Sequence, residues 1–140
     1  MTRLRDGIET AYFWAAAEGP GLEHLRVRPG PPESIAHGLV LGVRDGQPYR
    51  LLYKIKWGPD WRVRKATFEV QDARGPRERM LKTDGRGKWR DDNDELPELA
   101  GCTDLDIAAT PFTNTLALKR LDLKPGQATE IRTAYVSLPG

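Results

Sequence analysis

Short segments of alternating apolar and polar residues, separated by turn residues, run through most of this 140-residue chain. The first three are residues 11–16, 22–28 and 35–43, with Glu18-Gly19-Pro20-Gly21 between the first two. Successive side chains of a β-strand point to opposite faces of its sheet, so this period of two predicts strands joined by tight turns. We therefore expect a mainly β fold.

Two segments show where the strands must end or turn. Residues 28–33 contain three prolines, which lack a backbone donor and restrict the backbone angle, so no strand can continue through them. Asp45-Gly46 separates two apolar runs, and this pair favours a two-residue hairpin turn. The sequence therefore predicts a hairpin at residues 44–47.

The strands that follow this hairpin differ in how regularly they alternate. Residues 49–55 place their odd-numbered, apolar side chains on one face, as a half-buried strand does. Residues 61–70 begin with apolar residues at odd positions and continue with apolar residues at even positions. A one-residue slip moves side chains to the opposite face, so we predict a β-bulge near Arg64 and Lys65.

The second half of the chain also favours strands. One hairpin is expected around the loop 83–87, and two further strands around residues 124–126, while the acidic loop 91–95 is typical of solvated surface. A short helical turn is expected only at residues 110–114, where Thr110 can cap and Pro111 suits the first helical position. The strands in this half are residues 79–82, 88–90, 115–123 and 130–138.

Composition and charge exclude several classes of protein. The formal net charge is only +2, which argues against nucleic-acid binding, since that relies on many cationic contacts to phosphate. One cysteine and two histidines exclude a disulfide framework and a Cys/His zinc site, so we expect no metal and no cofactor. The apolar run 11–17 is too short for a signal peptide or a membrane span, which predicts a cytoplasmic protein without stable membrane insertion.

Residues 101–115 hold the densest cluster of functional groups. Asp104 and Asp106 alternate with aliphatic residues, so both carboxylates share one face, and Thr113 and Asn114 add a hydroxyl and an amide nearby. The carboxylates could divide acid and base roles, the oxygens could hold a hard cation, or the group could bind a polyol. Alternatively, one aspartate pairs with an inward Arg, and the Thr and Asn side chains hydrogen-bond the backbone of a turn.

Cys102 is expected to be a buried, unreactive thiol. A nucleophilic cysteine needs an activating base close by. His24 and His37 lie in early strands, and no sequence pattern links either of them to Cys102. Both histidines are therefore expected to be ordinary strand residues.

A second cluster combines tryptophans with basic residues near strand ends. An aromatic plate and a guanidinium fork suit a lipid head group or a sugar face. The alternative is a set of core tryptophans on strands whose surface carries Arg. The residues concerned are Trp57, Trp61, Arg62, Arg64, Lys88, Trp89 and Arg90.

Several motifs resemble those of the bacterial putative glycolipid-binding family. Gly-Cys-Thr-Asp-Leu-Asp at 101–106 and Thr-Pro-Phe-Thr-Asn-Thr-Leu at 110–116 resemble its C-terminal hallmark. The likeness covers nearly the whole chain after Tyr12, although Ala117 stands where a proline is usual and Leu105 where a valine is usual. Shorter matching pieces lie, in the family's order, at 21–25, 49–53, 61–64, 85–89 and 119–121.

The resemblance implies a single domain, residues 1–140, in which one curved antiparallel sheet forms an incomplete β-barrel with at most one or two short helical turns. It also implies non-enzymatic binding of a glycolipid or another amphipathic molecule on the concave face of the sheet. The alternatives are an enzyme that uses Asp104 and Asp106 as acid and base on a small polar substrate, and a small interaction module. The predicted ligand-binding residues are Tyr53, Trp61, Arg62, Arg64, Trp89, Asp104, Asp106, Thr113, Asn114 and Arg120.

Overall fold

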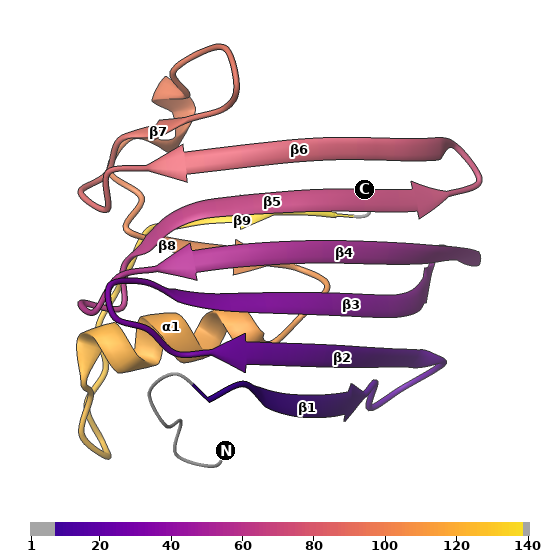
Figure 1. Cartoon of the computed structure of the whole chain (residues 1–140), viewed down its shortest axis with the longest axis horizontal. Coiled ribbons are helices and arrows are strands. Elements are labelled where there is room, and N and C mark those ends of the chain that lie inside the picture. Colours follow the sequence, from indigo (N-terminus) through magenta and orange to yellow (C-terminus); the bar gives the residue numbers. More distant parts are fainter. Residues whose placement is uncertain (1–7, 139–140) are drawn as a thin grey trace.

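A seven-stranded antiparallel sheet dominates the computed structural model, which describes residues 8–138. Each strand pairs with its neighbours in sequence, and the sheet curves without closing into a barrel (Figure 1). This confirms the predicted mainly β fold with an open, curved sheet. The strands are β1 Thr10–Ala15, β2 Gly21–Arg28, β3 Ser34–Arg44, β4 Gln47–Trp57, β5 Val63–Asp72, β6 Gly75–Thr83 and β7 Trp89–Arg90.

Two local predictions in this sheet are confirmed. Asp45 and Gly46 join β3 to β4, and both have positive φ angles (51° and 76°), as a primed turn requires. Between β4 and β5, Lys56 pairs with Lys65 whereas Trp57 pairs with Val63. Arg64 is therefore the extra residue of a β-bulge, and the bulge keeps the apolar residues before and after it on the same face.

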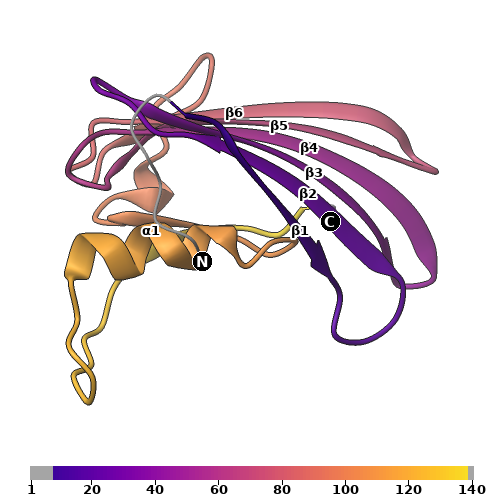
Figure 2. The same ribbon diagram turned by 60° about the horizontal axis from the view of Figure 1, so that its bottom comes forward.

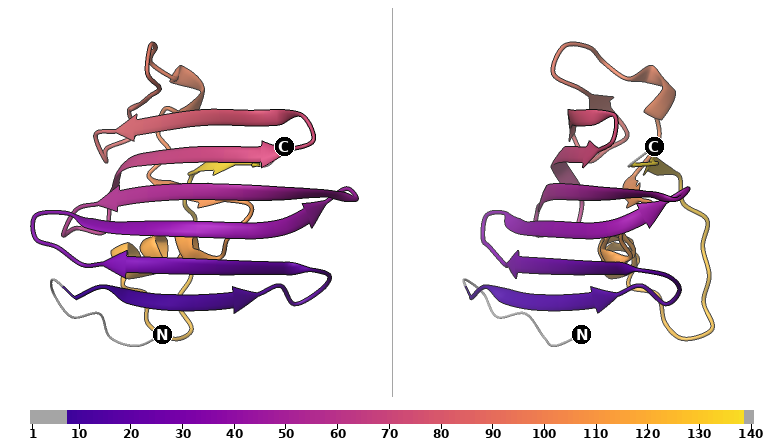
Figure 3. Two further views of the ribbon diagram at one scale, coloured as in Figure 1. Left: turned by 45° about the vertical axis from the view of Figure 1, so that its right-hand side comes forward. Right: turned by 90° about the vertical axis from the view of Figure 1, so that its right-hand side faces the viewer.

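A second layer lies beneath the concave face of the sheet (Figure 2). It consists of the helix α1, Phe112–Leu121, and two short parallel strands, β8 Asp104–Ile107 and β9 Thr133–Val136. A 3-10 turn, Pro97–Leu99, precedes them. Figure 3 shows the helix and these strands against one side of the sheet only, so the other side, here called the outer face, is not covered by them.

The core lies between the sheet and this second layer. Inward apolar residues of β2 to β5 are buried, and so are Leu81 of β6, Leu105 and Ile107 of β8, and Ala134 and Val136 of β9. The middle of the concave face is thus filled by the chain itself. Among the fully buried side chains are Leu25, Leu51, Ile55, Trp57, Phe68, Leu81, Ile107 and Leu116.

The prediction of a strand at residues 115–123 was wrong, because most of this segment belongs to α1. The buried residues of α1 are Phe112, Thr113 and Leu116, which is helical spacing, while Leu118 is exposed. The amide of Phe112 donates to Oγ1 of Thr110 (3.1 Å), but the N-cap position is occupied by Pro111 rather than Thr110, and the helix runs ten residues, longer than the expected turn. The strand expected at 130–138 is shorter and pairs in parallel with β8.

Candidate functional site

The predicted ligand-binding residues do not form one site. Asp104 and Arg120 make a buried bidentate ion pair, with Arg120 Nε and Nη2 donating to the two carboxylate oxygens at 3.0 and 2.7 Å. This contact raises the pKa of the Arg120 guanidinium. Asp104 therefore holds α1 against β8. This is the structural alternative, in which one of the two aspartates pairs with an inward Arg.

The other polar residues of the hallmark segment are placed separately. Thr113 is buried, and its Oγ1 accepts a hydrogen bond from the backbone amide of Ile107 (3.2 Å). Asn114 is exposed on the first turn of α1, and Asp106 is half-buried on β8. Thr113 thus hydrogen-bonds the backbone, as expected if it has a structural role. Asp106 and Asn114 take no part in this contact.

The aromatic and basic residues hold loops together. Arg64 donates to Asp60 (2.9 Å), and Arg62 donates to the carbonyl of Gly85 (2.7 Å), which ties the β4–β5 loop to the β6–β7 loop. Trp61 stacks on Trp57 with ring centroids 6.2 Å apart. Separately, Trp89 is buried in the core and donates its indole N–H to the carbonyl of Cys102 (2.8 Å).

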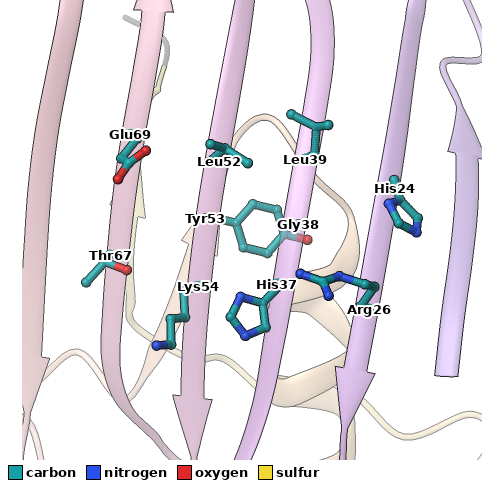
Figure 4. A pocket seen from close by; sticks show the side chains of 10 residues that line it. All are labelled: His24, Arg26, His37, Gly38, Leu39, Leu52, Tyr53, Lys54, Thr67 and Glu69. Atoms are coloured by element: carbon teal, nitrogen blue, oxygen red, sulfur yellow. The ribbon is translucent and has the colours of Figure 1, made fainter. Parts of the chain in front are cut away.

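Tyr53 differs from these residues, because it belongs to a buried polar cluster on the concave side of the sheet. Its ring reaches from β4 across β3, where Gly38 leaves room for it (Figure 4). Its hydroxyl donates to Oε2 of Glu23 on β2. The hydroxyl of Thr110, two residues before α1, also lies near the Glu23 carboxyl and lowers its pKa. We call Glu23, Tyr53 and Thr110, together with Tyr12 on the same face of the neighbouring strand β1, the Glu23 cluster.

Two atoms of the Glu23 cluster lack a partner. Glu23 is only 4% exposed, and its Oε1 has no hydrogen-bond partner among the described residues. The buried hydroxyl of Tyr12 on β1 is likewise without a partner within residues 8–138. An unpartnered buried polar group is destabilising by about 1–3 kcal/mol, so each of these two atoms is a place where another molecule, such as water or a ligand, can supply a missing hydrogen bond.

The electrostatics of the cluster are governed by burial. Burial raises the pKa of Glu23 and outweighs the nearby hydroxyls of Thr110 and Tyr53, which lower it. Burial also raises the pKa of Tyr53, and the nearby Glu23 carboxylate raises it further. The phenol therefore keeps its proton and serves as a fixed donor, while the carboxyl is the group whose charge responds to its surroundings.

Aromatic side chains surround the Glu23 cluster on its open side. Trp14 lies directly opposite Glu23 in the β1–β2 register, and its ring stacks on that of Tyr12 at a centroid distance of 6.4 Å. Tyr12, Trp14 and Tyr49 are only partly buried and pack against the core. The carboxyl therefore has flat, partly exposed rings beside it, two on the edge strand β1 and one on β4.

Three of the motifs that carry the family resemblance meet at this cluster. Residues 21–25 supply Glu23, residues 49–53 supply Tyr53 and Tyr49, and residues 110–116 supply Thr110. Tyr53 was predicted from the sequence as a ligand-binding residue, whereas Glu23 was not. The signal was present, since Glu23 shares the odd, inward phase of Leu25 and Val27, where a carboxylate is unusual.

Metal binding and membrane crossing by a helix find no support in residues 8–138. No group of three or more His, Cys, Asp or Glu side chains in this part of the chain could hold a metal ion. No helix within it is long and apolar enough to cross a membrane.

Comparisons with known proteins agree with the fold and the motifs. The sequence pattern of the family described as "Putative glycolipid-binding" matches residues 11–140. The chain is also similar to the crystal structure of a DUF1089 family protein from Pseudomonas aeruginosa, at 36% sequence identity and a TM-score of 0.72, over 99% of this chain and 72% of that one. No curated protein is detectably similar. The chain therefore belongs to the putative glycolipid-binding family.

Proposed function

We propose that this protein binds an amphipathic ligand with a hydroxyl-bearing head group, such as a glycolipid, and that Glu23 is the residue that holds the head group. The observation that carries this proposal is the buried Oε1 of Glu23, which lacks a donor. A ligand hydroxyl can donate to this oxygen, and another polar group of the ligand can bond the hydroxyl of Tyr12 on the neighbouring strand β1. The family description names the same class of ligand.

The surrounding rings suit the rest of such a ligand. Sugars present apolar C–H faces, and the apolar faces of Tyr12 and Trp14 can pack against them. The partly exposed ring of Tyr49 adds apolar surface for the lipid portion. Within the described part of the chain β1 pairs only with β2, so a small movement of this edge strand would open a path to Glu23.

The proposed site lies at the margin of the concave face rather than at its centre. Ile55, on the inward face of β4, is fully buried in the core. Trp61 contacts Trp57 and lies near Lys119, whose Nζ is 6.0 Å from the Trp61 ring centroid. Neither Ile55 nor Trp61 contacts the unpartnered atoms of Glu23 and Tyr12 in the described part of the chain. We therefore assign the head group to Glu23 and Tyr12.

The enzymatic alternative finds less support at the two aspartates. Acid–base catalysis by Asp104 and Asp106 needs carboxyls whose environments separate their pKa values and leave them accessible. Asp104 is buried and occupied on both oxygens by Arg120. Catalysis by this pair would therefore require the ion pair that fastens α1 to break.

Titration of the intact protein with n-octyl β-D-glucoside below its micellar concentration tests the proposal. We expect saturable binding by calorimetry, and Glu23→Gln should weaken it about 10-fold or more, because a hydrogen bond to a charged group contributes about 1.5–3 kcal/mol. Tyr12→Phe should weaken it by a smaller factor. Glu98→Gln, at an exposed carboxylate, is the control and should bind like the unaltered protein. Equal affinity of Glu23→Gln and the control would contradict the proposal.

A further inference from the structure

The outer face of the sheet carries two rows of residues that are mostly basic. In the strand register, Arg26 lies opposite His37, which lies opposite Lys54. The next row crosses β2 to β6 and contains Arg28, Ile35, Lys56, Lys65 and Lys82. Because the chain as a whole has a formal net charge of only +2, folding concentrates positive charge on this face.

Apolar residues occupy the adjoining part of the same face. Phe13 is 68% exposed and stacks on His24 with ring centroids 4.7 Å apart. Leu22 and Leu41 lie opposite each other on β2 and β3 and are 47% and 45% exposed. Val43, farther along β3, is 44% exposed. Large side chains this exposed, gathered beside a basic area, are typical of an interaction surface.

A hollow lies where the basic and apolar parts meet. It has a volume of about 510 Å³ and opens on the outer face. Figure 4 shows Leu39 and Leu52 on one side of it and Arg26, His37 and Lys54 on the other. Burial lowers the pKa of His37, and the charges of Arg26 and Lys54 lower it further, so the hollow lies in a positive field.

Acidic residues limit this surface at two places. Glu9 approaches Arg26 at 3.7 Å, with both side chains half exposed, so salt and water screen the pair. Glu69 lines the hollow on the β5 side and lies opposite Glu78 on β6. The positive field is therefore strongest over β2, β3 and β4 and along the row from Arg28 to Lys82.

We propose that the outer face docks on the surface of a lipid bilayer that contains anionic phospholipids. Basic side chains beside exposed apolar ones match the two parts of a bilayer surface, which presents anionic phosphates above acyl chains. The hollow would seat one head-group phosphate among Arg26, His37 and Lys54. A nucleic acid is a poorer match, because stacking of bases needs several exposed rings and Phe13 is the only Phe, Tyr or Trp on the described strands of this face.

Among the described residues this surface meets the Glu23 cluster at Tyr53, which also lines the hollow, and the charged residues of the two sites lie on opposite faces. Glu23 and Tyr53 point to the concave side, whereas Lys54 and Lys56 alternate with them and point outward. The two proposals therefore make separate predictions. Glu23→Gln should leave docking unchanged even if it abolishes binding of the glucoside.

Co-sedimentation with vesicles tests the docking proposal. We expect the protein to bind vesicles of 70% phosphatidylcholine and 30% phosphatidylglycerol and not to bind pure phosphatidylcholine vesicles. Lys54→Glu/Lys56→Glu should weaken binding at least 10-fold. Lys119→Glu/Lys124→Glu makes the same change of charge on α1 and the loop after it, across the sheet from the outer face, and should change binding less than 2-fold. Circular dichroism checks that both variants fold.

Further measurements distinguish docking on a bilayer from simple attraction to anions. Leu41→Asn leaves the charge unchanged and should weaken vesicle binding about 3-fold or more, because it removes exposed apolar surface. Inorganic phosphate at 10 mM should not displace the vesicles at constant ionic strength. Displacement by phosphate, equal binding of a 20-base-pair DNA, or equal loss in the two double variants would overturn the proposal.

Discussion

Tyr53 lies across Gly38, and this contact allows the tyrosine hydroxyl to reach Glu23 two strands away. A Cβ atom at position 38 would stand 2.1 Å from the Tyr53 ring, far closer than atoms can approach. Gly38 is therefore needed for the close approach of the ring over β3. The position of the buried donor depends on the absence of a side chain on the intervening strand.

Gly38→Ala is expected to destabilise the protein by about 1–3 kcal/mol, because the added methyl group must displace the Tyr53 ring. Urea unfolding at pH 7 measures this change. In a Tyr53→Ala background, where the ring is gone, the same substitution should have a much smaller effect. Additive effects of the two substitutions would show that the ring does not occupy the space above Gly38.

Glu23→Gln is expected to stabilise the protein at neutral pH. The pKa of Glu23 is raised in the folded protein, so the charged form is the one that burial disfavours. The contribution of this carboxyl to stability is most favourable below the ordinary glutamate pKa of 4.5 and is lost as the pH rises through the raised pKa of the folded protein. The Glu23→Gln variant has no charge to bury and so avoids this loss of stability. Its free energy of unfolding at pH 8 should exceed that of the unaltered protein by about 1–2 kcal/mol.

The pH dependence distinguishes this explanation from a general packing effect. Urea unfolding of both proteins at pH 8 and at pH 4 should show the difference at pH 8 and little difference at pH 4. Glu98→Gln, an exposed control, should show neither. A Glu23→Gln variant that is less stable at pH 8 would refute the assignment of a destabilising buried charge.

Removal of one partner of the Asp104–Arg120 pair should strongly destabilise the fold. Arg120→Leu leaves a buried carboxylate without its counter-ion, which typically destabilises by about 3–5 kcal/mol. Asp104→Asn/Arg120→Leu removes the unpaired charge and should regain most of that loss. Chemical denaturation of the two variants measures both values, and the double variant should still bind the glucoside if Asp104 has only a structural role.

Local sequence patterns predicted the sheet well because its strands follow a strict period of two. The Asp45-Gly46 turn and the bulge at Arg64 were both readable from residue type and phase. The same reasoning failed at residues 115–123, where Leu116 and Leu118 alternate with smaller residues and a short run of this kind fits either a strand or a helix. The contacts of Leu116 with the core and of Arg120 with Asp104 decide for the helix, and both are tertiary.

The candidate site was only partly predictable for a related reason. Tyr53 stood out as an inward aromatic residue, but its partners come from β2 and from the start of α1. The sequence places Glu23 in the inward phase of β2 and says nothing of which side chains face it. The pair Asp104 and Asp106 suggested acid–base catalysis, because two carboxylates on one strand face can divide these roles. The contact of Asp104 with Arg120 could not be predicted in the same way, since it depends on how α1 packs on β8.

Native mass spectrometry tests the central claim, that Glu23 anchors an amphipathic ligand, most directly. Unaltered protein, Glu23→Gln and Glu98→Gln are each exposed to a bacterial total lipid extract, repurified, and measured under native and denaturing conditions. We expect one bound hydroxyl-bearing amphiphile per chain in the unaltered protein and in Glu98→Gln, and little or none in Glu23→Gln. An empty unaltered protein, or the same ligand retained equally by Glu23→Gln, would contradict the claim.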